Sequence, residues 1–473
     1  MAPGIRPFAC CEGNNISRRR PLPAALLGTA VALAAAVCGA QPAIAEPSSA
    51  PQPADKPECP IGLTCRYIPA AYARTDPSKP AAYGNYHKAD RPRDGDDIRY
   101  IVIHDTEERY DRAIARFQDP HTKVSTHYLI RSSDGEITQL VHTKDIAHQA
   151  GNYWFNMHSI GIEHEGVLAD GAHWYTEAMY QSSARLVRYL AARYHIPLDR
   201  DHILGHEEVP GTTPAGVAAM HYDPGPYWDW AHYFDLLGAP LRGASSDGVA
   251  VLAAHLSDPP VVTIAPRFTT NTEPLRSCTV NSCTDLPSQG SNVVYLRTEP
   301  SADAPLVGDP AVHPDGSPGT TRVADWSARA VAGQSFVVAD RRGKWTAIWF
   351  GGRLAWLETR VSAPEHGPLV TPRPGRSAIP VYGTAYPEAA AYPATVPVTT
   401  AVALQYTIPA GQVYLGVEPH RGDYYYATFD GGTVPGYHTL VVGNRRFVEI
   451  SFNHRRAFVD ANDVVIEDYR VRR

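Results

Sequence analysis

The chain lacks an excess of basic residues. Its 43 Lys and Arg are outnumbered by 49 Asp and Glu, which gives a formal net charge of −6 at pH 7. Binding to a nucleic-acid backbone normally requires a basic surface, so we do not expect nucleic acid as a partner. Charged residues make up only 19% of the chain, while hydrophobic residues make up 44%. This composition excludes a wholly disordered chain and favours packed cores.

Long apolar runs are also scarce. The run at residues 23–40 follows three arginines at 18–20 and is followed by Ala43-Ile44-Ala45. It is short for a membrane span, which needs about 20 apolar residues, and prolines flank it. Basic residues, a short apolar run and a small-residue cleavage motif predict a secretory signal peptide over residues 1–45. A membrane anchor is the alternative, but we expect a secreted protein without a stable anchor.

Cysteine is infrequent, with seven in the whole chain. Three of them lie in the predicted signal peptide, and the other four form two close pairs: Cys59 with Cys65, and Cys278 with Cys283. In an oxidising compartment such pairs predict two local disulfides. A four-cysteine zinc site is the alternative, but its pairs usually have roughly two to four intervening residues, and the first pair is spaced more widely.

At 473 residues the chain has room for about three domains. Beyond an N-terminal extension over residues 46–92, alternating strand and helix patterns predict an α/β domain with a central mixed sheet at residues 93–240. The expected strands lie at 99–104, 127–131, 137–141, 159–163 and 202–206, and the expected helices lie at 107–118 and after Thr176. Thr176 can cap the second helix.

The C-terminal half shows a different pattern. Residues 241–288 are rich in Pro, Ser and Thr and predict a linker that carries the second cysteine pair. Residues 345–361 recur in outline at 447–464, and the alternating apolar pattern predicts two small all-β barrels, at 289–363 and 377–473. The segment before the first repeat resembles bacterial SH3-like domains. We therefore predict a multidomain protein: an α/β domain followed by two SH3-like barrels.

Polar residues follow several predicted strands of the α/β domain. His104 and Glu163 each end a strand, His206 follows another, and His221 and Asp223 come from a later loop. Because side chains at the carboxyl ends of neighbouring strands can converge on one cleft, these residues form a candidate site. Two imidazoles and one carboxylate are a suitable ligand set for a catalytic zinc ion with a fourth position open.

Five motifs carry a family resemblance: IVIHDTEE, THYLIRSSDG, SIGIEHEG, GHEEVPG and HYDPGPYWDW. In this order they resemble the type 2 zinc N-acetylmuramoyl-L-alanine amidases, which are related to phage amidases and animal peptidoglycan recognition proteins. The resemblance implies that His104, His206 and Asp223 bind Zn2+ and that Glu163 is the catalytic carboxylate. It also places His221 where many relatives carry a lysine that assists the transition state.

The function implied by this resemblance is hydrolysis of the amide bond between N-acetylmuramic acid and L-alanine in peptidoglycan. Peptidoglycan is the expected partner, the expected location is secreted and cell wall-associated, and zinc is the cofactor. The sequence does not specify an oligomeric state, and we take a monomer as the expectation. A non-catalytic peptidoglycan-binding protein and an amidase that acts on soluble muropeptides are the alternatives.

The chain departs from the family pattern in places. Residues 148–151 read His-Gln-Ala-Gly where the family often has Trp-His before Ala-Gly, and the segment between His206 and Asp223 is longer than in compact relatives. His127 and His221 are rival ligands; for His127 we favour a structural role, and for His221 transition-state stabilisation. Four aromatic residues of the first repeat either fill a barrel core or leave one set accessible to the cell wall: Trp345, Trp349, Phe350 and Trp356.

Overall fold

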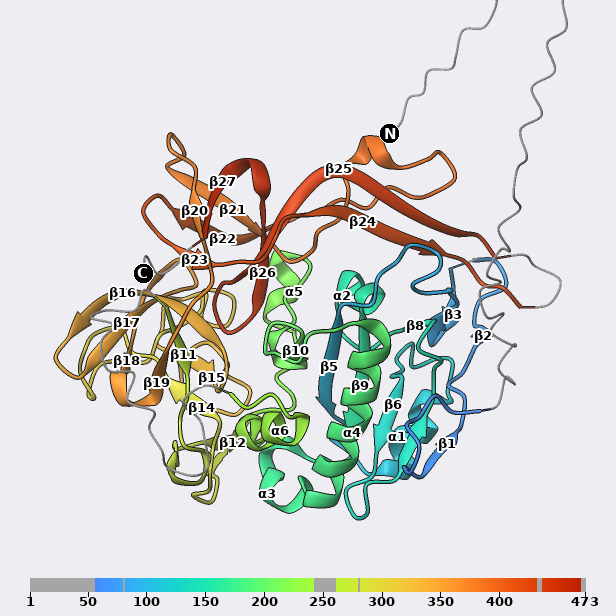
Figure 1. The fold of residues 1–473 in the computed structure, drawn as a ribbon, viewed down its shortest axis with the longest axis horizontal. Coiled ribbons are helices and arrows are strands. Elements are labelled where there is room, and N and C mark those ends of the chain that lie inside the picture. Colours follow the sequence, from blue (N-terminus) through green and yellow to red (C-terminus); the bar gives the residue numbers. More distant parts are fainter. Residues whose placement is uncertain (1–55, 80, 242–260, 280, 432–435, 469–473) are drawn as a thin grey trace, which may run out of the picture. The chain divides into compact units, whose positions relative to one another are not determined.

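The computed structural model describes residues 56–79, 81–241, 261–279, 281–431 and 436–468 (Figure 1). The predicted signal peptide lies outside these residues. Among the described helices, none combines the length and apolar character needed to cross a membrane. Disulfides join Cys59 to Cys65 and Cys278 to Cys283, so both predicted pairs are confirmed.

The α/β domain is built on a six-stranded mixed sheet with the order β1-β7-β6-β9-β5-β10. All neighbours are parallel except β6 and β7. The six strands are β1 (Cys65–Tyr67), β5 (Tyr100–Asp105), β6 (Tyr128–Ile130), β7 (Ile137–Gln139), β9 (Ser159–His164) and β10 (Ile203–Gly205). The predicted central mixed sheet is therefore present, with β9, β5 and β10 side by side.

Six α-helices lie in the described part of this domain. They are α1 (Tyr110–Phe117), α2 (Tyr153–His158), α3 (Gly171–Trp174), α4 (Glu177–Tyr194), α5 (Pro214–Val217) and α6 (Trp230–Leu237). Two of them, α3 and α5, have only four residues. Thr176 caps α4 as predicted, since its hydroxyl accepts a hydrogen bond from the Met179 N–H at 3.3 Å. Helix α1 begins three residues later than expected, because Glu107 has a positive φ of 51° and the N-cap residue Arg109 is still extended.

The two faces of the sheet are covered by different parts of the chain. On β5, Ile101 belongs to the apolar cluster that includes α4 and α6, while Tyr100 belongs to the cluster on the opposite face. That second cluster combines aromatic residues of α2 with two residues of C-terminal strands: Trp154, Phe155, Phe447 and Phe458. The C-terminal region thus supplies part of the second apolar layer that a largely parallel sheet requires.

The C-terminal region consists of antiparallel sheets. One five-stranded sheet has the order β18-β17-β16-β11-β19, and another has the order β22-β21-β26-β25-β24. The strands of the first are β11 (Val261–Ile264), β16 (Ser335–Arg342), β17 (Trp345–Phe350), β18 (Arg353–Glu358) and β19 (Ser362–Glu365). Those of the second are β21 (Ala378–Tyr382), β22 (Ala403–Pro409), β24 (His420–Ala427), β25 (His438–Ser451) and β26 (Arg456–Asp460). Strand β11 comes from the segment expected to be a linker.

Smaller sheets complete the architecture. Strand β20 (Pro368–Pro372) lies between β23 (Tyr414–Leu415) and β27 (Val464–Asp468). The remaining two-stranded pairs are β2 (Ala73–Arg74) with β3 (Tyr83–Gly84), β4 (Tyr86–His87) with β8 (Ile146–Ala147), β12 (Arg276–Cys278) with β13 (Cys283–Asp285), and β14 (Val293–Tyr295) with β15 (Arg329–Val331).

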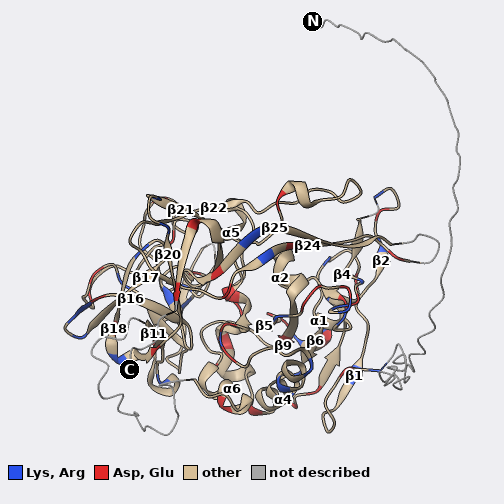
Figure 2. Cartoon of the chain, turned by 45° about the horizontal axis from the view of Figure 1, so that its top comes forward, with Lys and Arg blue, Asp and Glu red and all other residues tan. Residues whose placement is uncertain are grey.

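The aromatic residues of the first repeat are largely inside the protein. Trp345, Phe350 and Trp356 are at most 8% exposed, and the half-buried Trp349 packs against two apolar clusters. Of the two alternatives, these positions agree with the one in which the aromatic side chains fill cores, and they leave only part of Trp349 exposed. Basic and acidic residues are both scattered over the described part of the chain (Figure 2).

Candidate metal centre

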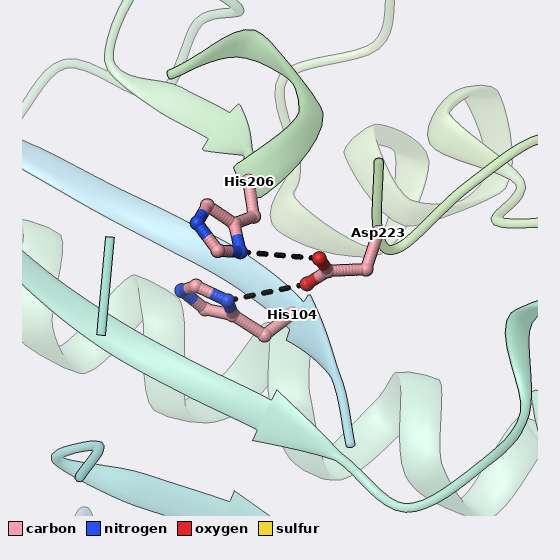
Figure 3. A group of neighbouring side chains, drawn as sticks. All are labelled: His104, His206 and Asp223. Atoms are coloured by element: carbon pink, nitrogen blue, oxygen red, sulfur yellow. Dashed lines mark hydrogen bonds and ion pairs between the residues drawn. The ribbon is translucent and has the colours of Figure 1, made fainter. Parts of the chain in front are cut away.

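Two histidines and an aspartate meet at the carboxyl edge of the sheet (Figure 3). His104 lies on β5, opposite Glu163 of β9, and His206 directly follows β10. Asp223 comes from the loop between α5 and α6. The potential ligand atoms of His104, His206 and Asp223 all lie within 4.8 Å of one another, and the three residues are buried. The structure therefore brings the three sequence-predicted ligands together.

The Asp223 carboxylate lies between the two imidazoles. Its Oδ2 is 3.2 Å from His104 Nδ1, and its Oδ1 is 3.1 Å from His206 Nδ1. The backbone N–H of Asp105 also donates to Oδ2, at 3.2 Å. Burial alone would raise the pKa of Asp223, but the neighbouring histidines outweigh it and hold the pKa well below its usual range. Both imidazoles therefore present Nδ1 to an ionised carboxylate.

Gln149 orients His104. Its Oε1 accepts a hydrogen bond from His104 Nε2, while its Nε2 donates to the Ser159 hydroxyl at 2.7 Å. The hydrogen bond to Nε2 leaves the Nδ1 lone pair directed at the ligand group, which is how a metal-binding histidine is normally held. A Cβ at position 161 would lie 2.7 Å from Gln149 Cγ, so the close approach of Gln149 requires Gly161.

Glu163 lies beside this group. Its Oε1 is 4.0 Å from His104 Nδ1, and its side chain is 13% exposed. Its Oε2 is buried and has no hydrogen-bond partner among the described residues. Burial raises the pKa of Glu163 to about 7. A carboxylate with such a pKa can accept and release a proton near neutral pH, as a general base requires.

His221 is at the open side of the group. Its side chain is 70% exposed, its ring stacks on that of His206 at 4.8 Å, and its Nδ1 is 3.6 Å from Asp223 Oδ1. A hydrogen bond to Asp223 raises the pKa of His221, which favours the protonated form. His221 is therefore a candidate proton or hydrogen-bond donor beside the three buried residues.

His127 has a structural environment. The Gly161 N–H donates to its Nδ1 at 3.0 Å, and its Nε2 lies 3.1 Å from the Asp145 carbonyl oxygen. Burial lowers the pKa of His127 to about 3. Both ring nitrogens are thus engaged by neighbouring protein atoms, and His127 is not a member of the ligand group.

A cavity of about 480 Å³ opens onto the candidate site. Its lining includes all five residues singled out in the sequence: His104, Glu163, His206, His221 and Asp223. Phe117 and Val124 add apolar surface, while Arg116 and Lys123 add positive charge. Asp105, Glu107 and Glu108 also line it, and Glu108 pairs with Arg116, so the cavity offers apolar surface beside charges of both signs.

Comparisons with known proteins agree with this arrangement. The family model for N-acetylmuramoyl-L-alanine amidase matches residues 94–226. N-acetylmuramoyl-L-alanine amidase A from Achromobacter lyticus is 34% identical over 174 residues, which cover 33% of this chain and 90% of that protein.

Solved structures resemble this chain only distantly. The endolysin amidase from Clostridium intestinale has 19% identity and a TM-score of 0.22, covering 30% of this chain and 81% of that chain. The Staphylococcus aureus hydrolase AmiA, solved with its ligand, has 15% identity and a TM-score of 0.26, covering 38% and 83%. Family membership rests on the similarity to the Achromobacter protein, because this chain matches nearly all of that protein. The chain therefore belongs to the N-acetylmuramoyl-L-alanine amidase family.

Proposed function

We propose that this chain hydrolyses the amide bond between N-acetylmuramic acid and L-alanine in peptidoglycan, with a zinc ion held by His104, His206 and Asp223. The observation that carries the proposal is the buried two-histidine, one-aspartate group, with Glu163 beside it, at the edge of a cavity. Membership of the amidase family supports the same activity.

The residues present fit a zinc ion. Two imidazoles and one carboxylate are a known catalytic ligand set that leaves one position open. The hydrogen bond from His104 Nε2 to Gln149 leaves His104 Nδ1 available on the side of the Asp223 carboxylate. When bound, zinc would supply Lewis acidity, which polarises the scissile carbonyl and makes a coordinated water more acidic.

Glu163 would move the proton. Its carboxylate, beside His104 and directed at the cavity, would accept a proton from the attacking water and pass it to the departing L-alanine nitrogen. His221 would donate a hydrogen bond to the negatively charged oxygen of the tetrahedral intermediate. The buried ligand group, Glu163 and His221 would thus have separate roles in one cavity.

Digestion of purified sacculi tests the proposed function. We expect the full chain to release material with new L-alanine amino termini and no new reducing sugar ends, because the amide bond is cleaved and the glycan is not. Labelling of amino termini followed by mass spectrometry would measure both products. Binding to sacculi without new amino termini would support the non-catalytic alternative instead, and new reducing ends would identify a glycosidase.

Replacement of His221 tests its proposed role as a hydrogen-bond donor to the transition state. We expect His221→Ala to retain zinc and to lower kcat by about a hundred-fold, the loss typical of removing one oxyanion donor. His221→Lys, the matched control, should recover much of the rate because it restores a positive charge. Zinc content and steady-state kinetics on a soluble muropeptide would be measured; loss of zinc in His221→Ala would make this residue a ligand.

The remaining predictions concern export and the C-terminal region. We propose that residues 1–45 direct secretion and that the two C-terminal repeats are SH3-like modules for the cell wall. The repeats are supported by a shared order of two strands, a one-turn 3-10 helix and a strand: β17, β18, Thr359–Val361 and β19, then β25, β26, Ala461–Asp463 and β27. Any wall contact has to use surfaces other than the buried aromatic residues of the first repeat.

A further inference from the structure

The turn between β25 and β26, residues 452–455, contacts the backbone of the candidate metal centre. Arg455 in this turn is 3% exposed. Its Nη1 donates to the Val209 carbonyl oxygen at 2.7 Å, and its Nη2 donates to the carbonyl oxygens of His221, at 2.8 Å, and Met220, at 3.4 Å. All three carbonyls belong to the segment that joins His206 to Asp223. A residue more than 230 positions away along the chain thus binds the ligand-bearing loop.

These contacts link the two ends of the loop between His206 and Asp223. Val209 and His221 lie at the two ends of the long loop that contains α5, and one guanidinium binds the carbonyls of both. Next to this contact, the Glu207 N–H donates to the Asp223 carbonyl oxygen at 2.8 Å. Arg455 and this backbone hydrogen bond therefore act together with the side-chain contact of His206 and Asp223 to hold the two ligands side by side.

His454, in the same turn, lies against the residue that follows the proposed ligand His206. His454 is fully buried, and its Nε2 lies 3.3 Å from Oε2 of Glu207, the residue after His206. The His454 carbonyl accepts a hydrogen bond from Gln334 Nε2 at 2.9 Å, and the same nitrogen donates to Glu208 Oε1 at 3.0 Å. Both glutamates that follow His206 are therefore contacted by the C-terminal region.

The geometry at position 455 requires a guanidinium. Two different nitrogens donate to carbonyls at the two ends of the loop, and the group lies 4.5 Å from the ring centre of the buried Trp326. Burial lowers the pKa of Arg455 to about 10, which leaves it charged at neutral pH. Lysine has one ammonium in place of the planar fork, so it cannot reproduce both contacts. Lysine at position 455 would therefore leave buried carbonyl oxygens of the loop without a hydrogen-bond donor.

We propose that the turn at residues 452–455 positions the metal centre, with Arg455 as its main positioning residue and His454 as its second. This inference rests on the proposed zinc amidase function. It makes the C-terminal region a structural part of the active site in addition to any role at the cell wall. The turn acts through the loop of Asp223 and His221 and through Glu207, not through contact with the substrate.

The test compares Arg455→Lys with the wild-type full chain. We expect the dissociation constant for zinc to rise by roughly 10–100-fold, the usual cost of losing a residue that supports metal ligands. At saturating zinc, kcat on a soluble muropeptide should still fall by about tenfold, while KM changes by less than about twofold, because the turn does not touch the substrate. Zinc affinity is measured by competition with a chromogenic chelator.

Arg456→Lys is the matched control. Arg456 is the next residue and equally buried, but it pairs with Glu449 at 2.6 Å and Asp201 at 2.7 Å, away from the ligand loop. We expect this variant to lower the melting temperature while zinc affinity and kcat stay at the wild-type level. Equal losses of zinc affinity in both variants would show a general effect of lost stability and would overturn the positioning role.

Two further outcomes are decisive. If Arg455→Lys does not fold, His454→Asn carries the test, because it removes the imidazole that lies against Glu207, the Arg329 carbonyl and the Trp326 ring; its zinc affinity should fall several-fold. Wild-type zinc affinity and kcat in the folded variant would overturn the inference while the amidase function stands. If the wild-type chain itself neither binds zinc nor releases L-alanine termini, the proposed function fails, and the inference fails with it.

Discussion

Glu163→Gln should retain zinc and lose most of the amidase activity. The amide keeps the size of the side chain but cannot accept a proton from water, so we expect kcat/KM to fall by roughly a hundred- to ten-thousand-fold. The three proposed ligands are unchanged, and Glu163 Oε1 is 4.0 Å from His104 Nδ1. The zinc content of the purified variant should therefore equal that of the wild type.

A carboxylate elsewhere in the cavity provides the control. Glu108 also lines the cavity, but its side chain pairs with Arg116 at 2.5 Å. Glu108→Gln removes the same charge without removing the base, and we expect it to keep activity within about tenfold of the wild type. Turnover of a soluble muropeptide and zinc content would be measured for both variants. Near-normal turnover by Glu163→Gln would refute its role as the base.

The candidate site could be predicted from the sequence because parallel strands share one edge. Once the segments at 99–104, 159–163 and 202–206 are assigned as strands, His104, Glu163 and His206 must follow neighbouring carboxyl ends. The adjacent order of β9, β5 and β10 places them together. Asp223 and His221 lie on a loop without such periodicity, so their residue types made them candidates and the family motifs gave them their roles.

Gln149 could not be assigned a role from the sequence. It lies in a segment that was noted only as a departure from the family pattern, and its partner His104 is 45 positions away. Helix α2 was also missed, although Asn152 caps it by accepting a hydrogen bond from the Trp154 N–H at 3.0 Å. An Asn followed by aromatic residues is a weak signal, since packing of Trp154 and Phe155 stabilises so short a helix.

The packing of the C-terminal strands on the α/β domain was likewise not predicted. The apolar residues of β5 show that both of its faces are buried, but they do not indicate what covers each face. Tyr100 illustrates this: its ring belongs to a cluster with Phe447 and Phe458, and its hydroxyl donates to Glu449 Oε2 at 2.5 Å. Contacts between residues more than 340 positions apart leave no local sequence pattern. The sequence therefore could not show that the C-terminal strands also pack against the α/β domain.

His104→Ala should lower both bound zinc and activity. The substitution leaves one histidine and one aspartate, and a two-ligand site holds zinc poorly. Because a bound metal contributes several kcal/mol to transition-state stabilisation, we expect activity to fall by roughly a thousand-fold. His202→Ala is the matched control, since His202 lies just before β10 and pairs with Asp199 at 2.6 Å, away from the ligand group. It should keep zinc and activity.

Zinc per chain in these two variants and in the wild type, measured by mass spectrometry after dialysis against zinc-free buffer, tests the proposed metal centre most directly. We predict one zinc per chain in the wild type and in His202→Ala, and little zinc in His104→Ala. Amidase activity should follow the zinc content across the three proteins. Full zinc occupancy in His104→Ala, or full activity in zinc-free wild-type protein, would contradict the assignment of His104, His206 and Asp223 as the ligands of a catalytic zinc ion.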